Sequence, residues 1–274
     1  IPGGGSPKES IDPDLLKTAP DIFMAMIDTA DIVAERYKLS REYQDEYSLE
    51  SQRRMAAAQQ ANKFKDEIVP MKTKMKVVDK ATKAETIVDY VVDRDECNRP
   101  ETTLEGLAKL KPIVRNPGTV TAGNASGVND GAAAMILASE VAVKRHGLTP
   151  RAKILGLASA AVPPRIMGIG PVPATRKLVE RLGIKVSDFD LIELNEAFAS
   201  QGIACLRQLG VKEDADFVNP HGGAIALGHP LGMSGARLVL TAVHGMEKRG
   251  GKLALATMCV GVGQGVAVAI EKLN

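Results

Sequence analysis

The sequence predicts an α/β fold in which strands and helices alternate over residues 151–274. Three observations support this prediction. Short apolar runs typical of strands recur at 153–160, 191–194 and 252–257. Segments with helical periodicity, such as 171–182, separate these runs. Glycine-rich turns follow the strands. Such alternation is typical of a sheet that is covered by helices.

The predicted order of elements in this region is βαβαβαββ. Pro173 suits the first turn of the first helix, where a missing N–H costs no hydrogen bond. The last two strands share a short glycine-rich turn and are therefore expected to be antiparallel. The strands are predicted at 153–160, 191–194, 217–218, 252–257 and 266–270, and the helices at 171–182, 196–209 and 235–248.

The region before residue 118 is predicted to be rich in helix. Residues 21–62 show helical apolar spacing, and Ser40 is placed to cap the second of two helices. Val77-Val78 and 86–88 predict a small hairpin, and residues 104–110 a short helix. The lysines of this hairpin form either a solvated face or a surface that attracts anionic substrates; they are Lys72, Lys74, Lys76, Lys80 and Lys83.

Residues 118–146 predict a strand, a turn and a helix in succession. Residues 119–121 are the expected strand, and 123–131 the glycine-rich turn. Asp130 is expected to cap an alanine-rich helix over 131–146.

Composition excludes several classes of protein. The net charge of +2 and the 3% of aromatic residues argue against a nucleic-acid binder. No apolar run approaches the roughly 18 residues of a membrane span, and no signal peptide is evident. Three widely spaced cysteines indicate neither a disulfide framework nor a zinc site. A cytoplasmic location is therefore expected.

The chemistry is expected at the ends of two strands and in one glycine-rich loop. Asn195 follows the strand at 191–194, Cys259 follows the strand at 252–257, and ligands in open α/β sheets bind beyond such strand ends. The loop 219–237 contains five glycines and His229 before a helix. Each residue also has a structural interpretation, with Asn195 as a helix N-cap and His229 as a hydrogen-bonded loop residue.

The cysteines alone suggest a Cys–His enzyme. Acidic neighbours disfavour a thiolate at Cys97, and Cys205 lies on an apolar helix. Cys259 precedes glycine N–H groups that suit a thiolate. Cys259 with His229 is thus the reactive pair that a hydrolase or transferase would use.

Three motifs resemble the thiolase family in sequence and in order. They are NEAFA at 195–199, GGAIALGHPLGMSGAR at 222–237 and CVGVGQG at 259–265. The resemblance extends from about Asp21 to the end of the chain. It implies a layered αβαβα fold with a complete C-terminal half at 151–274. The resemblance also implies a loop domain covering the active site at 1–117, and the last part of the N-terminal half at 118–150.

The resemblance implies an acyl-CoA:acetyl-CoA C-acyltransferase, which cleaves 3-ketoacyl-CoA or condenses two acyl-CoA molecules. Cys259 would then exchange a proton with the substrate and would not be the nucleophile. His229 and a water held by Asn195 would stabilise the enolate oxygen. The backbone N–H of Gly261 would belong to a second oxyanion hole.

The resemblance also implies residues that bind substrate. Ser126 would contact the pantetheine arm of coenzyme A, and Arg99 would lie near its adenine. Met167, Ala197 and Phe198 would line the acyl tunnel, although Met167 and Phe198 also suit a core. Coenzyme A is expected as the substrate carrier, with no metal or redox cofactor. A homodimer or homotetramer is expected, with the 77–88 hairpin as a site for tetramer contacts.

The resemblance places the nucleophilic cysteine in an N-terminal segment before Asp21. Residues 1–7 predict a loop that leads into no strand, so this segment is expected to be missing and the chain alone to be inactive. The alternative is a non-catalytic module that binds CoA or lipid. Two departures from the family pattern are Val262, in place of a glycine, and His221, which leaves the preferred acyl chain length open.

Overall fold

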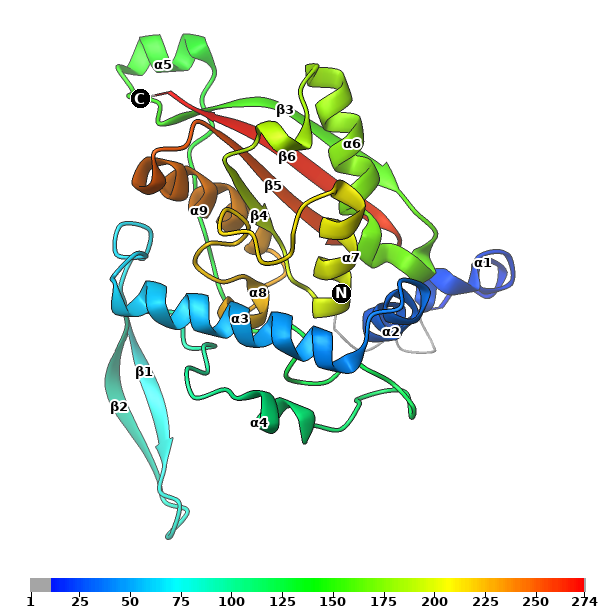
Figure 1. Cartoon of the computed structure of the whole chain (residues 1–274). Helices are drawn as coiled ribbons and strands as arrows, with labels where there is room; N and C mark the ends of the chain where they lie inside the picture. Colours follow the sequence, from blue (N-terminus) through cyan, green and yellow to red (C-terminus); the bar gives the residue numbers. More distant parts are fainter. Residues whose placement is uncertain (1–10, 274) are drawn as a thin grey trace.

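A computed structural model describes residues 11–273 and contains one four-stranded mixed sheet (Figure 1). Its strands are β3 (Ala152–Ala161), β4 (Leu191–Leu194), β5 (Leu253–Val260) and β6 (Gln264–Lys272), in the order β3-β6-β5-β4. β6 is antiparallel to both of its neighbours, while β4 and β5 are parallel. The predicted α/β class and the predicted antiparallel pairing of the last two strands are confirmed.

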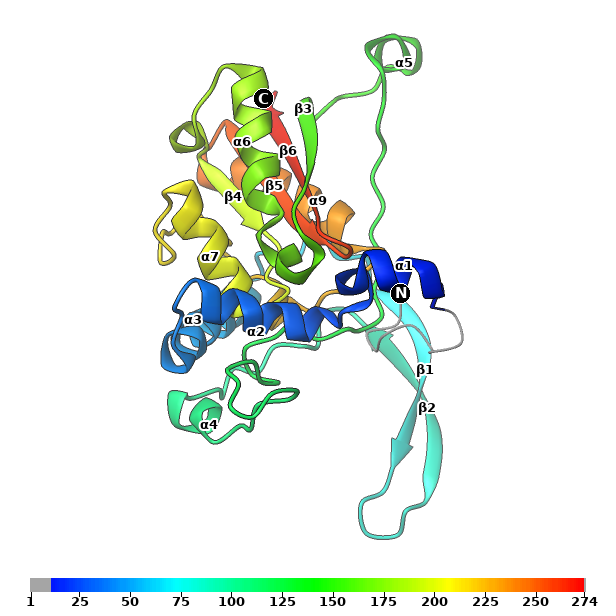
Figure 2. The same ribbon diagram turned by 90° about the vertical axis from the view of Figure 1, so that its right-hand side faces the viewer.

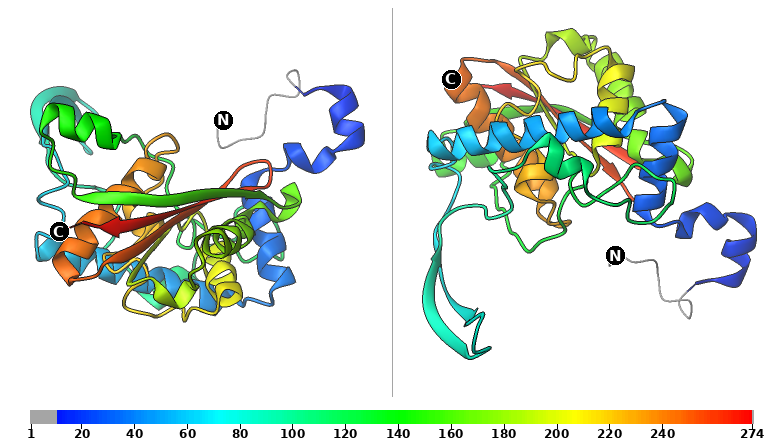
Figure 3. Two further views of the ribbon diagram at one scale, coloured as in Figure 1. Left: turned by 90° about the horizontal axis from the view of Figure 1, so that it is seen from above. Right: turned by 60° about the horizontal axis from the view of Figure 1, so that its bottom comes forward.

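Helices cover both faces of this sheet (Figure 3). α6 (Pro171–Leu182) and α7 (Ala199–Leu209) pack on one face, and α9 (Ser234–Arg249) packs on the other. Successive strand residues point to opposite faces. Leu255 therefore joins the core beneath α6 and α7, whereas Ala254 joins the core beneath α9.

The remaining elements precede or connect those of the sheet. They are α1 (Pro13–Thr18), η2 (Pro20–Phe23), α2 (Met26–Arg36), α3 (Arg41–Gln60), β1 (Met71–Val78), β2 (Glu85–Val92), α4 (Leu104–Ala108), α5 (Glu140–His146), η3 (Pro164–Ile169), η4 (Val186–Asp188) and α8 (Ala224–Leu227). None of the helices within residues 11–273 is long and apolar enough to cross a membrane.

The N-terminal helices pack beside α7. α2 contacts η3 and α7, and α3 contacts α7 and α8. The side chain of Ser40 accepts a hydrogen bond from the Tyr43 N–H, so the predicted cap of α3 is confirmed. The predicted hairpin is also confirmed, and β1 and β2 project away from the rest of the molecule (Figure 2).

Two predictions for residues 118–146 are wrong. Residues 119–121 form no strand, because their N–H groups bind side chains: Thr119 and Val120 donate to Asp31, and Thr121 donates to Asn124. Residues 131–139 form no helix, and only α5 is helical, capped by Ser139 and not by Asp130. Ile136 is 86% exposed, so the apolar face that would stabilise such a helix has little to pack against.

Two boundaries near the site also differ from prediction. The helix expected at 196–209 begins at Ala199, and Phe198 is its N-cap. The interpretation of Asn195 as a helix N-cap is therefore wrong. The strand expected at 217–218 is reduced to one bridge between Val218 and Ile192, since Asn219 already turns away from the sheet. The loop expected for residues 1–7 lies outside the described residues.

Candidate active site

The candidate site begins where the parallel strands β4 and β5 end. The Asn195 N–H donates to the Thr257 carbonyl at 3.0 Å, so the chain stays beside β5 for one residue beyond β4. Cys259 lies two residues after Thr257 on β5. The two predicted strand-end residues therefore lie at the same edge of the sheet, as the parallel pairing requires.

A loop brings His229 to this edge. The side-chain amide of Asn219 anchors the start of the loop, because it accepts from the Leu194 N–H at 2.9 Å and donates to the Leu194 carbonyl at 2.8 Å. Gly228 has a φ of +97°, and a Cβ there would lie 2.1 Å from the Asn129 side-chain oxygen. Only glycine therefore suits the residue before His229.

The imidazole of His229 contacts one side chain at each nitrogen. Its Nε2 lies 3.4 Å from Nδ2 of Asn195, and its Nδ1 lies 2.5 Å from Oγ of Ser234. Burial lowers the pKa of His229, and the positive charge of Arg237 lowers it further. The ring is therefore neutral at neutral pH and can accept a proton.

Cys259 lies in a small apolar cluster with Met167 and Ala197, and Met26 and Phe198 pack against it. Burial raises the pKa of the Cys259 thiol to about 12. The apolar surroundings do not favour a thiolate at Cys259, and the role of Cys259 in a Cys–His hydrolase stays an untested expectation. A thiol in this setting stays protonated and is suited to donate a proton.

The other predicted residues lie at different distances from this cluster. The Ser126 N–H donates to the Ala197 carbonyl at 3.0 Å, and the next residue, Gly127, accepts from the His229 N–H at 2.8 Å. The segment of Ser126 thus contacts both parts of the site. Arg99 is exposed in the loop before α4, and its N–H donates to the Gln52 side chain at 2.8 Å. The described contacts do not bring Arg99 to the site.

Gly261 belongs to the turn between β5 and β6, next to Val262 and Gly263. Val262 has a φ of +67° and Gly263 a φ of +86°. A β-branched residue is strained in this region of backbone space. Val262 is also 45% exposed, so little packing offsets the strain.

Sequence reasoning missed Glu196, which points away from Asn195 and into the contact with α3. Its carboxylate accepts from the Ser51 hydroxyl at 2.7 Å, from the Tyr47 hydroxyl at 3.1 Å and from the Asn219 amide at 2.9 Å. Glu196 therefore ties α3 to the loop that carries His229. The signal available in the sequence was a carboxylate two residues after the end of an apolar strand.

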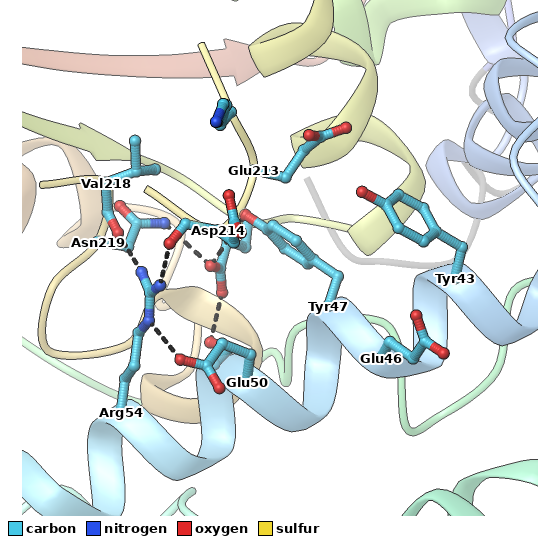
Figure 4. A pocket seen from close by; sticks show the side chains of 12 residues that line it. Tyr43, Glu46, Tyr47, Glu50, Arg54, Glu213, Asp214, Val218 and Asn219 are labelled. Carbon is cyan, nitrogen blue, oxygen red and sulfur yellow. Dashed lines mark hydrogen bonds and ion pairs between the residues drawn. The ribbon is translucent and has the colours of Figure 1, made fainter. Parts of the chain in front are cut away.

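A cavity of about 400 Å³ lies on this opposite side, between α3 and residues 212–219 (Figure 4). Arg54 contributes to its wall, and its guanidinium donates to the Val218 carbonyl at 2.6 Å and to the Asp214 carbonyl at 3.0 Å. None of the predicted catalytic side chains lines this cavity. The cavity is therefore separate from the edge with Asn195 and His229.

Sequence reasoning also missed a buried ion pair between β4 and α9. Arg237 donates to Glu193 at 2.9 Å, and the two residues are 6% and 0% exposed. Glu193 is two residues before Asn195, and Arg237 is eight residues after His229. A charged residue inside an apolar strand was the available signal.

Comparisons with known proteins agree with this arrangement. The family profile described as "Thiolase, C-terminal domain" matches residues 148–272, and the profile described as "Thiolase, N-terminal domain" matches residues 6–141. Part of the chain therefore corresponds to the N-terminal family domain. This match does not support the expectation that the N-terminal segment is missing.

Curated relatives include the beta-ketoadipyl-CoA thiolase of Pseudomonas putida, which is 66% identical over 91% of this chain and 60% of its own length. The acetyl-CoA acetyltransferase of Escherichia coli K12 is 49% identical over 90% of this chain and 59% of its own length. The chain thus spans about 60% of the length of the curated relatives it matches.

A solved structure of human mitochondrial 3-ketoacyl-CoA thiolase in complex with CoA is similar in fold. Its TM-score is 0.84 at 43% identity, and the match covers 98% of this chain and 65% of that chain. The acetyl-CoA acetyltransferase of Bacillus anthracis also has a TM-score of 0.84, at 42% identity, over 92% of this chain and 61% of that chain. The predicted thiolase-like fold is confirmed.

Proposed function

Since the chain belongs to the thiolase family, we propose that it carries the acid–base residues of an acyl-CoA:acetyl-CoA C-acyltransferase. The observation that carries this proposal is the meeting of His229 and Asn195 at 3.4 Å beside the edge of the sheet where Cys259 lies in an apolar cluster. A neutral imidazole, an amide and a protonated thiol are the groups that such a reaction needs.

The roles follow from the chemistry of cleavage. A cysteine thiolate attacks C3 of a 3-ketoacyl-CoA, the C2–C3 bond breaks, and the acyl group remains on the sulfur. The electron pair passes to the enolate of acetyl-CoA, which takes the proton of Cys259. The Nε2 of His229 takes the proton of the nucleophilic cysteine and then donates it in a hydrogen bond to the enolate oxygen, which a water held by Asn195 also stabilises. The N–H of Gly261 serves the acyl-cysteine. The thiol of coenzyme A then gives its proton back to Cys259 and attacks the acyl-cysteine, and the nucleophilic cysteine leaves as a thiolate.

The orphan oxygen of Asn195 supports its part in this scheme. The side-chain Oδ1 of Asn195 is buried and has no hydrogen-bond partner among the described residues. A buried acceptor of this kind is ordinarily paired with protein or with water. A water that donates to this oxygen would satisfy its hydrogen-bonding capacity and could donate its other proton to the thioester oxygen.

We further propose that the acyl-carrying nucleophile is none of the three cysteines at 97, 205 and 259. Burial and the charge of Asp95 raise the pKa of Cys97, and burial strongly raises the pKa of Cys205. Neither environment favours a thiolate. A full turnover therefore needs a further cysteine. Incubation with acetyl-CoA followed by peptide mass analysis tests this, and an acetyl group on any of the three would overturn it.

The substrate class that we propose is a 3-ketoacyl-CoA whose acyl chain ends in a carboxylate. The support is the name shared by relatives at 62% to 66% identity, beta-ketoadipyl-CoA thiolase, against 49% for an acetyl-CoA acetyltransferase. In an active preparation, kcat/KM is expected to be higher for beta-ketoadipyl-CoA than for acetoacetyl-CoA. The reverse order would overturn this assignment.

We also propose that the loop domain, residues 1–117, covers the CoA site, with Ser126 at the pantetheine arm and Arg99 near the adenine, in a homodimer or homotetramer. The contacts of α3 with α7 and α8 support the covering role. Exposed apolar side chains of the hairpin, such as Met71 and Ile87, support contacts between copies. Sedimentation equilibrium of the protein with Met71→Ser and Ile87→Ser tests the second point, since assembly is expected to weaken.

The acid–base proposal can be tested without an acyl-enzyme. In D₂O, the chain is expected to exchange the methyl protons of acetyl-CoA for deuterium, which NMR detects directly. Cys259→Ala is expected to slow the exchange by about 10²- to 10⁴-fold, the usual contribution of a positioned acid or base. Cys205→Ala, which also removes a buried thiol, is the matched control. Equal rates in both variants would contradict the role of Cys259.

A further inference from the structure

The first turn of α9 contacts both sides of the candidate site. Ser234 and Arg237 are one turn apart on the same face of the helix and are 1% and 6% exposed. Ser234 contacts the imidazole of His229, and Arg237 pairs with Glu193 on β4. One helical turn therefore joins the loop with His229 to the strand that leads to Asn195.

The contacts of the Ser234 hydroxyl favour one tautomer of the His229 ring, because Oγ of Ser234 lies between the Pro230 carbonyl, which can only accept, and Nδ1 of His229. A hydroxyl has one proton, and that of Ser234 is directed to the Pro230 carbonyl at 2.9 Å. Its oxygen then accepts the Nδ1–H of His229 at 2.5 Å. The neutral ring has one proton, so Nε2 retains its lone pair and faces the Asn195 amide.

The Glu193–Arg237 pair holds this turn against the sheet. Glu193 and Asn195 are two residues apart on an extended chain and so point to the same side. Glu193 is thus linked to Asn195 through its ion pair with Arg237, one turn of α9, and the contacts of His229 with Ser234 and Asn195. Oε1 of Glu193 and Nη2 of Arg237 are buried without partners among the described residues. A buried ion pair of this kind adds little to the free energy of folding. We therefore interpret the pair as holding the first turn of α9 in place against β4.

We propose that Ser234 and the Glu193–Arg237 pair are positioning residues that present His229 with its Nε2 unprotonated and at a fixed distance from Asn195. As a statement about turnover, this inference rests on the proposed thiolase function. As a statement about the protonation of the His229 ring, it does not. Glu67 and Asp95 also face Arg237, and burial raises the pKa of both carboxyl groups while Arg237 lowers it.

The test of Ser234 measures the ring nitrogens of His229 directly. With ¹⁵N-labelled histidine at pH 7.5, the protein is expected to show a protonated Nδ1 and an unprotonated Nε2. Ser234→Thr keeps a hydroxyl and is expected to keep this pattern, whereas Ser234→Ala is expected to shift population to the Nε2–H form. A dominant Nε2–H form in the unaltered protein, or an unchanged pattern in Ser234→Ala, would overturn the assignment.

A matched control separates positioning from general destabilisation. Ser200 is also a fully buried serine in the first turn of a helix, and its hydroxyl donates to the Ala30 carbonyl at 3.0 Å. Ser200→Ala is expected to leave the His229 pattern unchanged. In a preparation with thiolase activity, Ser234→Ala is expected to lower kcat on the order of 10- to 100-fold with KM within about twofold, and Ser234→Thr is expected to restore it.

The ion pair is tested with a double variant because either single change leaves a buried unpaired group. Glu193→Leu with Arg237→Met keeps the apolar volume, and its fold is checked by thermal unfolding. A folded double variant is expected to show a mixture of the two protonated forms of the His229 ring and to have a lower kcat. A folded double variant with the original pattern would overturn the role of the pair. If activity is absent throughout, the ring pattern still decides this inference, and only the proposed function fails.

Discussion

The sheet region, residues 152–272, is covered by helices on both faces, whereas residues 131–150 run beside the body with apolar side chains in solvent. Leu178 of α6 is fully buried, and Leu137 is 71% exposed. Both leucines lie in segments whose sequence favours a helix. A segment with a helical sequence pattern therefore forms a stable helix when another surface covers its apolar face.

The largest expected effect contrasts these two leucines directly. Leu178→Ala removes buried side-chain volume from the core beneath α6 and is expected to destabilise the protein by about 2 to 5 kcal/mol. Leu137→Ala is expected to change stability by less than about 0.5 kcal/mol. Urea unfolding monitored by circular dichroism measures both. Similar losses in the two variants would show that residues 131–150 are packed as closely as the sheet region.

The next prediction tests whether α3 stabilises the covered region through its contact with Glu196. Glu196→Gln places an amide opposite the hydroxyl of Ser51 and the amide of Asn219, which both donate to this carboxylate. A loss of roughly 1 to 3 kcal/mol is expected in the same unfolding experiment. Glu46→Gln alters an exposed carboxylate at the same cavity and is the control. Equal, small losses would mean that α3 is only loosely coupled to the sheet.

The third effect is a pH dependence in the covered region. Burial lowers the pKa of His221 to about 4, from an ordinary value of 6.5. Between these values the unfolded chain binds the proton and the folded protein does not, so stability falls as the pH decreases from 6.5 to 4. The loss is on the order of 1 to 2 kcal/mol after allowance for partial exposure of the ring.

His221→Gln is expected to flatten this part of the curve of unfolding free energy against pH. The exposed His146 at the end of α5 provides the control substitution, His146→Gln. A slope that persists in His221→Gln would assign the pH dependence to another group.

The smallest effect concerns the turn between β5 and β6, where the β-branched residue Val262 has a positive φ. Val262→Asn places a residue that tolerates positive φ before Gly263 and is expected to stabilise the protein by about 0.5 to 1 kcal/mol. Gly263→Ala is expected to do the opposite, since a Cβ there would lie 2.1 Å from the Val162 carbonyl oxygen. Thermal unfolding measures both changes. A destabilised Val262→Asn would show that Val262 makes a contact that offsets its strain.

Much of the site could be predicted because its residues follow local patterns. Asn195 and Cys259 end strands that are visible as apolar runs, and the parallel pairing of β4 and β5 brings them to one edge. His229 lies in a glycine-rich loop whose conformation requires glycine at position 228. The three motifs also carried the family resemblance, which the profile matches support.

The parts that could not be predicted depend on residues far apart in sequence. Glu196 is paired with Ser51 and Tyr47, and the pattern around each residue suggests only an exposed helix face or a capped helix start. The apolar surroundings of Cys259, which raise its pKa, could not be predicted from the glycine N–H groups beside it. Burial by Met167 and Ala197, which no neighbouring residue reveals, is the cause.

The sequence by itself determined the α/β class, the strands of the sheet, the turn before His229 and the family. These features depend on the periodicity of apolar residues and on glycine, both of which act within a few residues. Three features depend on tertiary contacts: residues 131–139 are not helical, Cys259 lies in an apolar cluster, and Ser234 and Arg237 reach His229 and Glu193. Packing and burial free energies depend on which surfaces meet, and one segment of sequence cannot specify its partner.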